Sequence, residues 1–336
     1  MKLKKYYSFL IYLFLILILA LVFILIICII LIHHHNKYLY FEDVKSNEIT
    51  LGIQTVFILK ENILFLREWI LYHLEIGFDK IFLYDNTGSI GADSSTSNKN
   101  KYDINFSSLV IMSDDEINTE MQQILQDFPN QVYYEKWQPR DSNNNIVYGQ
   151  SSSIGHYIQK YGHLTTHTAY IDIDEFIYSQ NNINIKSLFE NEITKIEIKQ
   201  KKFNDRFCIL PNSLIISSSN TITDINTTSW AHKLIIKNDA IDLTDIDDAN
   251  IHTLPIKYGK TIQITDENIL RFNHYNVNEK ALNWMKSFYK RDHFQFGTDT
   301  SIGDKYSDII LSKCNGKCIE FKSKYLKKHD KCVNFI

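Results

Sequence analysis

The chain has 336 residues, a formal net charge of −3 and a sequence pI near 6.5. This length suits a membrane anchor with one large domain or two small ones. The chain has no global basic field of the kind that attracts nucleic acid, so we expect no nucleic-acid partner. It is rich in Asn, Ile, Lys and Tyr, and clusters of Asn or Lys therefore carry little functional information.

The first element in the chain is an apolar run from Phe9 to Ile32. About 20 apolar residues cross a bilayer, whereas the core of a cleaved signal peptide has about 7–15. No small-residue cleavage site follows the run, and three lysines precede it: Lys2, Lys4 and Lys5. The positive-inside rule predicts a single-pass type II signal anchor over 9–32. Residues 1–8 would be cytoplasmic, and the rest would lie in a Golgi- or ER-like lumen or another extracytoplasmic space.

A short polar stem is expected over 33–49, before the folded domain. The run Ile53–Leu59 predicts a buried parallel strand, and apolar residues at helical spacing predict a helix over 62–76. Gly77 ends that helix, and Lys80–Tyr84 is the next strand. This strand–helix–strand order indicates a βαβ unit.

The alternation of strand and helix continues through the middle of the chain. A Ser/Asn/Gly-rich loop is predicted over 87–101, a strand over 131–137, a helix over 148–161 and a strand over 169–171. This order predicts an α/β domain with a mostly parallel central sheet and helices on both faces.

The second half of the chain is richer in strands, which we expect over 193–199, 233–237 and 269–275, before a helix over 279–291. No linker interrupts this region, so a single catalytic domain is expected over 50–293. A Lys-rich, cysteine-containing tail, 294–336, would follow.

Four cysteines follow the predicted anchor: Cys208, Cys314, Cys318 and Cys332. In an oxidising compartment they allow three pairings, among which the sequence cannot choose. A zinc site that uses His329 is the alternative, and we favour a disulfide. Asn105 and Asn226 begin N-glycosylation sequons, which matter only if the domain is lumenal.

An acidic motif, Asp172-Ile173-Asp174-Glu175-Phe176, follows the strand predicted over 169–171. Carboxylates two residues apart point to the same side of an extended chain and can reach one hard cation. Ligands bind at strand ends in open α/β sheets. A calcium loop starting at Asp172 would need Gly and Glu where the chain has Ile177 and Ile183. An Asp-x-Asp triplet occurs often by chance, so its surroundings decide its meaning.

Further motifs surround the acidic motif in a fixed order. They are Glu68-Trp69-Ile70, Tyr72-His73, Gly77, Tyr84-Asp85-Asn86 and Gln150 before it, and His232-Lys233, Ile251-His252 and Asn273-His274-Tyr275 after it. Over roughly 53–292 the ordered set resembles family 92 and related family 2-like glycosyltransferases. The resemblance implies a GT-A fold, a nucleotide-binding α/β sandwich. It also implies Mn²⁺ or Mg²⁺ held by the acidic motif against a nucleoside-diphosphate sugar.

The resemblance also implies roles for single residues. Asp174 would be the principal metal ligand, His252 could complete the metal shell, and Asp172 would meet the metal, its water shell or the ribose. The expected donor-binding residues are Glu61, Asp85, Asp172, Lys233 and His274. Glu175 either binds or only caps the strand end.

Two features of the site stay open. The loop over 87–101 departs from the family's compact Ser-x-Asp turn, which leaves Ser89 and Asp93 without a role. The catalytic base is unassigned, with Asp205 and Asp224 as candidates of equal standing.

Together these observations predict a membrane-anchored, metal-dependent hexosyltransferase. A UDP-sugar is the expected donor, a glycan or glycoprotein the acceptor, and inversion the outcome implied by the resemblance. One alternative is a catalytically silent relative that binds glycans or nucleotides. Another is a structural anchor protein with no nucleotide site.

Overall fold

The computed structural model describes residues 22–23, 48–89, 112–190, 192–203, 212–218, 221–223, 232–244, 251–275 and 296–325. Ile49–Ile336 forms one compact unit, separate from Met1–Glu48. Within the described residues, no helix has the length and apolarity needed to cross a membrane. The predicted anchor over 9–32 lies outside them except for Val22 and Phe23, and the helix expected over 279–291 lies outside them entirely.

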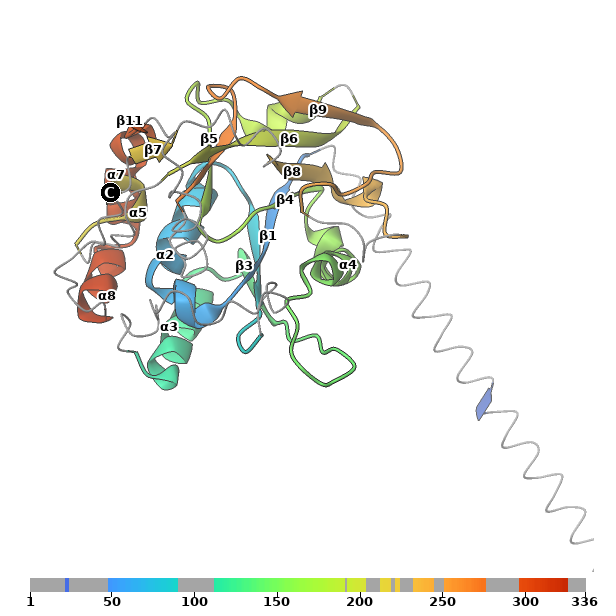
Figure 1. The fold of residues 1–336 in the computed structure, drawn as a ribbon, viewed down its shortest axis with the longest axis horizontal. Coiled ribbons are helices and arrows are strands. Elements are labelled where there is room, and N and C mark those ends of the chain that lie inside the picture. The colour runs from blue at the N-terminus through green and yellow to red at the C-terminus, as the bar shows by residue number, and fades with distance from the viewer. Residues whose placement is uncertain are drawn as a thin grey trace, which may run out of the picture. The chain divides into compact units, whose positions relative to one another are not determined.

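A mixed sheet of nine described strands forms the centre of the compact unit, in the order β3-β2-β1-β4-β8-β6-β10-β5, with β9 also paired to β6 (Figure 1). The strands are β1 (Leu51–Phe57), β2 (Lys80–Asp85), β3 (Val132–Lys136), β4 (His167–Tyr170), β5 (Glu175–Tyr178), β6 (Ile193–Lys202), β8 (His232–Lys237), β9 (Lys260–Ile264) and β10 (Arg271–His274). The predicted α/β class is therefore confirmed.

The sheet is parallel in one half and mixed in the other. Strands β3, β2, β1 and β4 are parallel, whereas β8 runs antiparallel to β4 and β6, and β5 antiparallel to β10. The mostly parallel arrangement expected for the whole sheet thus holds for its first half. The burial of β6 alternates along all its residues, as in a strand with one solvated face, which suits an antiparallel neighbour.

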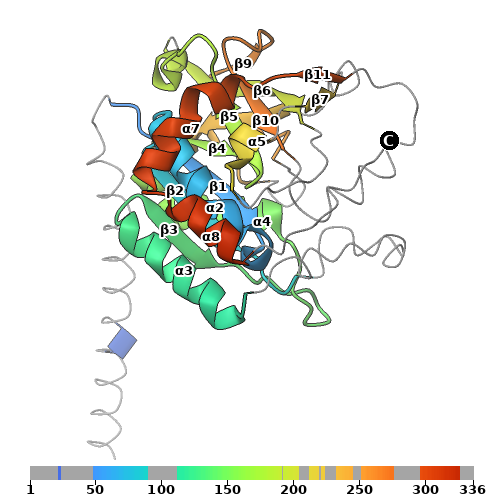
Figure 2. The same cartoon turned by 90° about the vertical axis from the view of Figure 1, so that its left-hand side faces the viewer.

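Helices cover both faces of the sheet (Figures 1 and 2). On one side lie α2 (Leu59–Glu75), α3 (Asp114–Asp127), α7 (Ser301–Lys313) and α8 (Lys317–Tyr325), and on the other α4 (Gln150–Tyr161). Successive residues of β2 alternate between two apolar cores, Ile81 and Leu83 in the core around α2 and Phe82 and Tyr84 in the core around α4. Shorter elements are η2 (Gly162–Leu164), η3 (Ile185–Phe189), α5 (Ile215–Ser218), η4 (Asn238–Ala240), and the paired strands β7 (Thr221–Thr223) and β11 (Phe296–Thr298).

Helix α2 is the central helix of the domain, and most of its residues are buried. A helix that is buried on most of its circumference belongs in a protein interior. Among its buried polar residues, Glu68 is fully buried and pairs with Lys322 of α8, with 2.6 Å between Oε2 and Nζ. The helix ends before Gly77, whose φ of 105° suits glycine. Thus α8, part of the predicted tail 294–336, packs on the centre of the domain.

The short link between β4 and β5 forces the sheet to curl. Three strands separate these two in the sheet, so a flat sheet would place them about 19 Å apart. Their link, Ile171 to Asp174, spans at most about 18 Å when fully extended. It is not extended, because the Glu175 N–H donates to the Asp172 carbonyl at 3.1 Å. The curled sheet therefore brings its far edge back towards β4.

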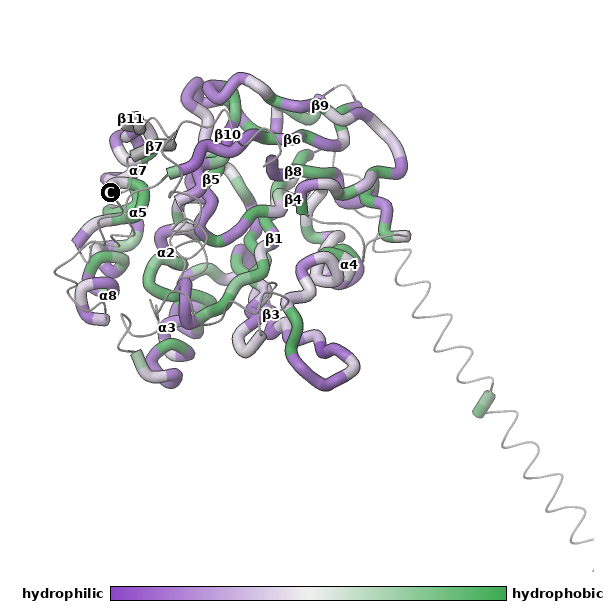
Figure 3. The backbone as a smooth tube through the Cα atoms, in the orientation of Figure 1, coloured by the Kyte–Doolittle hydropathy of each residue, from purple (hydrophilic) through white to green (hydrophobic). Residues whose placement is uncertain are grey.

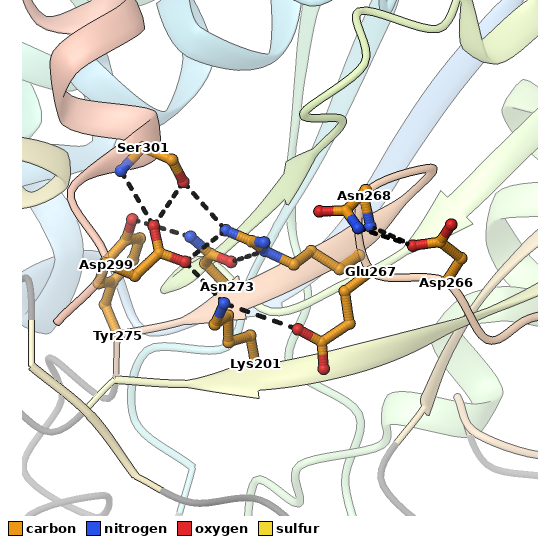
Figure 4. A network of polar contacts seen from close by, with 9 residues as sticks. Lys201, Asp266, Glu267, Asn268, Asn273, Tyr275, Asp299 and Ser301 are labelled. Carbon is orange, nitrogen blue, oxygen red and sulfur yellow. Dashed lines mark hydrogen bonds and ion pairs between the residues drawn. The ribbon is translucent and has the colours of Figure 1, made fainter. Parts of the chain in front are cut away.

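Charged side chains on β6 and β10 form a polar network with Asp299 and the start of α7 (Figure 4). Asp299 accepts from Arg271 and Lys201, both at 2.7 Å, and its other oxygen accepts from the Ser301 N–H at the start of α7. Burial would raise the pKa of Asp299, but Lys201 and Ser301 lower it to about 2. Arg271 also lies over the Tyr178 ring, 4.8 Å from its centroid. Figure 3 shows β10 as mainly hydrophilic, in contrast to the mainly apolar β1.

Replacing Asp299 by Asn is expected to lower the free energy of unfolding by about 3 kcal/mol, because Arg271 would keep a buried charge without its carboxylate. Chemical denaturation at pH 7 measures the change. Asp266→Asn is the matched control, since this exposed carboxylate bonds only within its turn to Asn268, and we expect a loss below about 0.5 kcal/mol. Equal losses in the two variants would contradict the anchoring role of Asp299.

A second prediction concerns His73, which is fully buried and links α2 to β5. Its Nδ1 lies 2.9 Å from the Trp69 carbonyl, and its Nε2 accepts from the Ile177 N–H at 3.4 Å, so the ring is neutral. Burial lowers the pKa of His73 to about 3. The unfolded chain binds this proton near pH 6.5, so the stability contribution is full above that pH and falls as the pH drops towards 3.

Unfolding free energies measured between pH 7 and pH 4 should therefore fall, and His73 should contribute about 1.4 kcal/mol per pH unit below 6.5. In a His73→Gln variant this part of the slope should disappear, whatever the loss of stability at pH 7. His163→Gln, in the half-buried η2, should keep the part of the slope that His73 contributes. A slope as steep in His73→Gln as in the parent protein would show that other groups cause the acid sensitivity.

Candidate active site

The acidic motif lies at the sheet edge where β4, β6 and β10 end. These three strands run in one direction, and β8 and β5 run in the other. The C-terminal ends of β4, β6 and β10 therefore meet the N-terminal ends of β8 and β5. The ends of strands carry the ligand sites of open α/β sheets. This arrangement brings together side chains from distant segments: Asp172, Asp174, Glu175, Lys202, Lys233 and His274.

Backbone bonds hold the acidic motif in place from two sides. The indole Nε1–H of Trp69 on α2 donates to the Glu175 carbonyl at 2.8 Å. The Tyr275 N–H, just after β10, donates to the Asp174 carbonyl at 3.0 Å. Asp174 and Glu175 are each 1 % exposed, so two carboxylates are buried at this edge.

Lys233, at the start of β8, bridges two of the carboxylates. Its Nζ lies 2.6 Å from Asp172 Oδ2 and 2.9 Å from Glu175 Oε2, and the residue is 2 % exposed. Burial would lower the pKa of Lys233, but the two carboxylates raise it above its usual value. Burial would raise the pKa of Asp172, and Lys233 brings it below its usual value. The pKa of Glu175 is raised, chiefly by burial.

His274, the last residue of β10, faces Asp174. Its Nε2 lies 3.5 Å from Asp174 Oδ1, and its Nδ1 is 2.5 Å from Gln200 Nε2 of β6. Burial would lower the pKa of His274, but Asp174 and Glu175 raise it above the usual value. The imidazole and the carboxylate thus lie at the same point of the edge.

Lys202 ends β6 beside His274, its partner in the sheet register. The residue is 5 % exposed, and burial lowers its pKa to about 8, against the opposing effect of Asp174. A buried ammonium group here places positive charge next to the acidic motif.

The start of α4 and the residues just before it approach the motif from the other side. Gln150 Nε2 lies 3.4 Å from both Asp172 Oδ1 and the Tyr148 hydroxyl. Burial raises the pKa of Tyr148, and the charges of Asp172 and Glu61 raise it further. Glu61, in the first turn of α2, therefore lies on this side of the motif.

The other described residues with predicted roles lie around this centre. His252 Nδ1 is 2.5 Å from the His232 carbonyl, and burial and Lys233 lower the pKa of His252. Asp85, at the end of β2, accepts from the Leu59 N–H at 3.2 Å and from the Tyr134 hydroxyl at 2.6 Å. These bonds fix the start of α2, and the nucleoside contact of Asp85 stays a prediction. The same holds for the ligand roles of Glu61, Lys233, His252 and His274.

Several predictions lie outside the described residues: Asp93, Asp205, Asp224, both sequons, Cys208 and Cys332. Cys314 and Cys318 are described, and both are buried and not joined by a disulfide.

The residues at the edge fit a divalent cation that a diphosphate would help to bind. Two ligands of one octahedral Mg²⁺ lie about 3 Å apart, and Asp174 Oδ1 and His274 Nε2 are 3.5 Å apart. Among the described residues, no group of three or more His, Cys, Asp and Glu side chains forms a ready metal site. Mg²⁺ typically takes one or two carboxylates together with substrate phosphates, so the Asp174 carboxylate would suffice, with the His274 imidazole beside it.

Gln200 and Lys202 were not predicted as site residues, although the sequence carries a signal for both. The buried face of β6 carries Thr194, Ile196 and Ile198 and then continues with Gln200 and Lys202. Polar residues on the inward face at the end of a strand indicate a site. The period-two alternation of this strand would have identified them.

Comparison with known proteins gives a distant match. No protein-family model matches the chain. A protein from Ricinus communis named a glycosyltransferase family 92 protein is 22 % identical over 237 residues, which cover 68 % of this chain. The match covers 35 % of the Ricinus protein, so the chain spans about a third of that relative's length.

The bond from Trp69 to the motif can be tested by stability. Trp69→Phe should lower the free energy of unfolding by about 2 kcal/mol, because the buried Glu175 carbonyl loses its donor and the core loses volume. Tyr72→Phe should cost about 1–2 kcal/mol, since its hydroxyl donates to the Ile177 carbonyl of β5 at 2.7 Å. Tyr133→Phe is the control, as its hydroxyl bonds in an exposed position. Denaturant unfolding measures all three. An unchanged free energy of unfolding in Trp69→Phe would show that the Trp69 hydrogen bond does not stabilise the motif.

Proposed function

We propose that the chain is a metal-dependent glycosyltransferase with a GT-A-type fold. It transfers a sugar from a nucleotide sugar, for which a UDP-sugar is our choice, to a glycan or glycoprotein. The observation that carries the proposal is the convergence of Asp174 and His274 at the edge where three strands end. The similarity to the Ricinus communis family 92 protein supports the class of reaction.

The charges at the edge suit a nucleoside diphosphate with its cation. When bound, Mn²⁺ or Mg²⁺ supplies charge neutralisation for the departing diphosphate. Asp174 and His274 are the residues that would hold it. Lys202 adds a buried ammonium group beside them, placed to meet a diphosphate oxygen. Tyr148 and Gln150 close the opposite side, where Glu61 and Asp172 are our candidates for donor contacts.

The acceptor side of the reaction is only partly assigned. An inverting transfer needs a carboxylate that takes the proton of the acceptor hydroxyl as it attacks the anomeric carbon. Asp205 and Asp224 remain the candidates for this base. The proposal includes a type II anchor over 9–32 and a lumenal domain, supported by the length of the apolar run and the lysines before it.

The test is nucleotide release by the full-length chain in detergent, measured with a panel of UDP- and GDP-sugars, with Mn²⁺ and with chelator. One donor should give metal-dependent release. Asp174→Asn should reduce it by about 100-fold or more, since charge stabilisation at the leaving group is lost. Asp242→Asn, an exposed turn carboxylate, should keep wild-type release.

Two other outcomes would change the proposal. Release that persists with chelator and in Asp174→Asn would remove the acidic motif from the mechanism. Thermal stabilisation by UDP and Mn²⁺ without release from any donor, across a panel of glycan acceptors, would favour the catalytically silent relative.

A further inference from the structure

We propose that Lys233 is a positioning residue that keeps Asp172 and Glu175 out of the metal shell and leaves Asp174 and His274 to hold the cation. The inference rests on the proposed function, because it concerns the cation of that reaction. It assigns Lys233 a role other than contact with the donor diphosphate.

Lys233 engages the carboxylates of both Asp172 and Glu175. The Nζ bonds Asp172 Oδ2 at 2.6 Å and Glu175 Oε2 at 2.9 Å. Glu175 Oε2 also accepts the Asp172 N–H at 2.8 Å, which closes a ring of hydrogen bonds among the three residues. The other oxygen of Asp172 faces Gln150 at 3.4 Å.

The position of Lys233 follows from strand pairing. In the antiparallel pair of β4 and β8, Tyr170 lies opposite Leu234, so Lys233 lies level with the first residue beyond β4. The burial of Lys233 removes water from its ammonium group, and the two carboxylates take the place of that water. A buried lysine on β8 is thus held against the motif by the sheet itself.

The charge of Lys233 has a consequence for the cation. An ammonium group a few ångströms from a divalent ion opposes its binding, and this effect is strong away from bulk water. With Lys233 present, the free protein should bind Mn²⁺ weakly and gain affinity when the nucleotide diphosphate adds its oxygens. Without Lys233, Asp172 becomes available as a third ligand and a positive charge is lost, so Mn²⁺ should bind more tightly. A purely structural lysine would predict weaker binding on its removal.

The experiment measures the Mn²⁺ dissociation constant of the full-length protein by electron paramagnetic resonance of free Mn²⁺, with and without UDP. We expect Asp174→Asn to weaken binding about ten-fold or more and Asp172→Asn to change it by less than about three-fold. Lys233→Met should tighten binding in the absence of UDP by about ten-fold. The double variant Lys233→Met/Asp172→Asn should lose most of that gain.

Lys202→Met is the matched control, since it removes another buried ammonium group, one that interacts electrostatically with Asp174. Lys202→Met should change the Mn²⁺ affinity equally in the parent protein and in Asp172→Asn. The comparison separates the general effect of removing a positive charge from the specific effect of the Lys233–Asp172 pair. Lys233→Arg, which keeps the charge, should keep wild-type affinity.

Several results would contradict the inference. If Asp172→Asn weakens Mn²⁺ binding as much as Asp174→Asn does, Asp172 is a ligand and the inference is wrong. It is also wrong if the gain in Lys233→Met persists in the double variant. Should Lys233→Met fail to fold, Asp172→Asn still decides, because Lys233 retains Glu175 there. A wild-type protein that binds no Mn²⁺, even with UDP, overturns the metal dependence of the proposed function first, and the inference with it.

Discussion

The link of four residues between β4 and β5 is the constraint on which the site depends. It joins strands that lie four places apart in the sheet, and so the sheet must curl. The same four residues contain both aspartates of the acidic motif. Curling brings the ends of β6 and β10, with Lys202 and His274, to the motif at the end of β4. The shape of the sheet and the composition of the site thus have one cause.

Several charged side chains are buried in the domain. Glu68, Asp174, Glu175, Lys233 and Lys322 are all at most 2 % exposed. Isolated charges at such depth are strongly unfavourable, and each needs a partner with good geometry. Glu68 and Lys322 form a buried ion pair that joins two helices and so has a structural role. At the sheet edge, three carboxylates, Asp172, Asp174 and Glu175, lie among Lys202, Lys233 and the His274 imidazole. Here charges from several strands meet at the strand ends, unlike the single pair between two helices.

Local patterns predicted the first half of the fold, and long-range pairing set the rest. The expected strand and helix at 53–59 and 62–76 correspond to β1 and α2 within a few residues. Helix α3 was missed, although Ser113 and Glu116 form a capping box visible in the sequence. The antiparallel insertion of β8 beside β4 has no local signal, because it pairs residues 64 to 70 positions apart. For that reason the sequence indicated Lys233 but not the carboxylates it bridges.

The buried pair of Glu68 and Lys322 also bears on how the chain is made. The two residues are 254 positions apart, and Glu68 lies on the central helix. During synthesis α2 emerges long before α8. The Glu68 carboxylate must therefore stay hydrated, or be protonated, until nearly the whole domain has been translated. The core around α2 therefore cannot close in its final form on a growing chain. Only the completed domain can bury α2 fully. A ribosome-bound intermediate would therefore keep the Glu68 face of α2 accessible to chaperones.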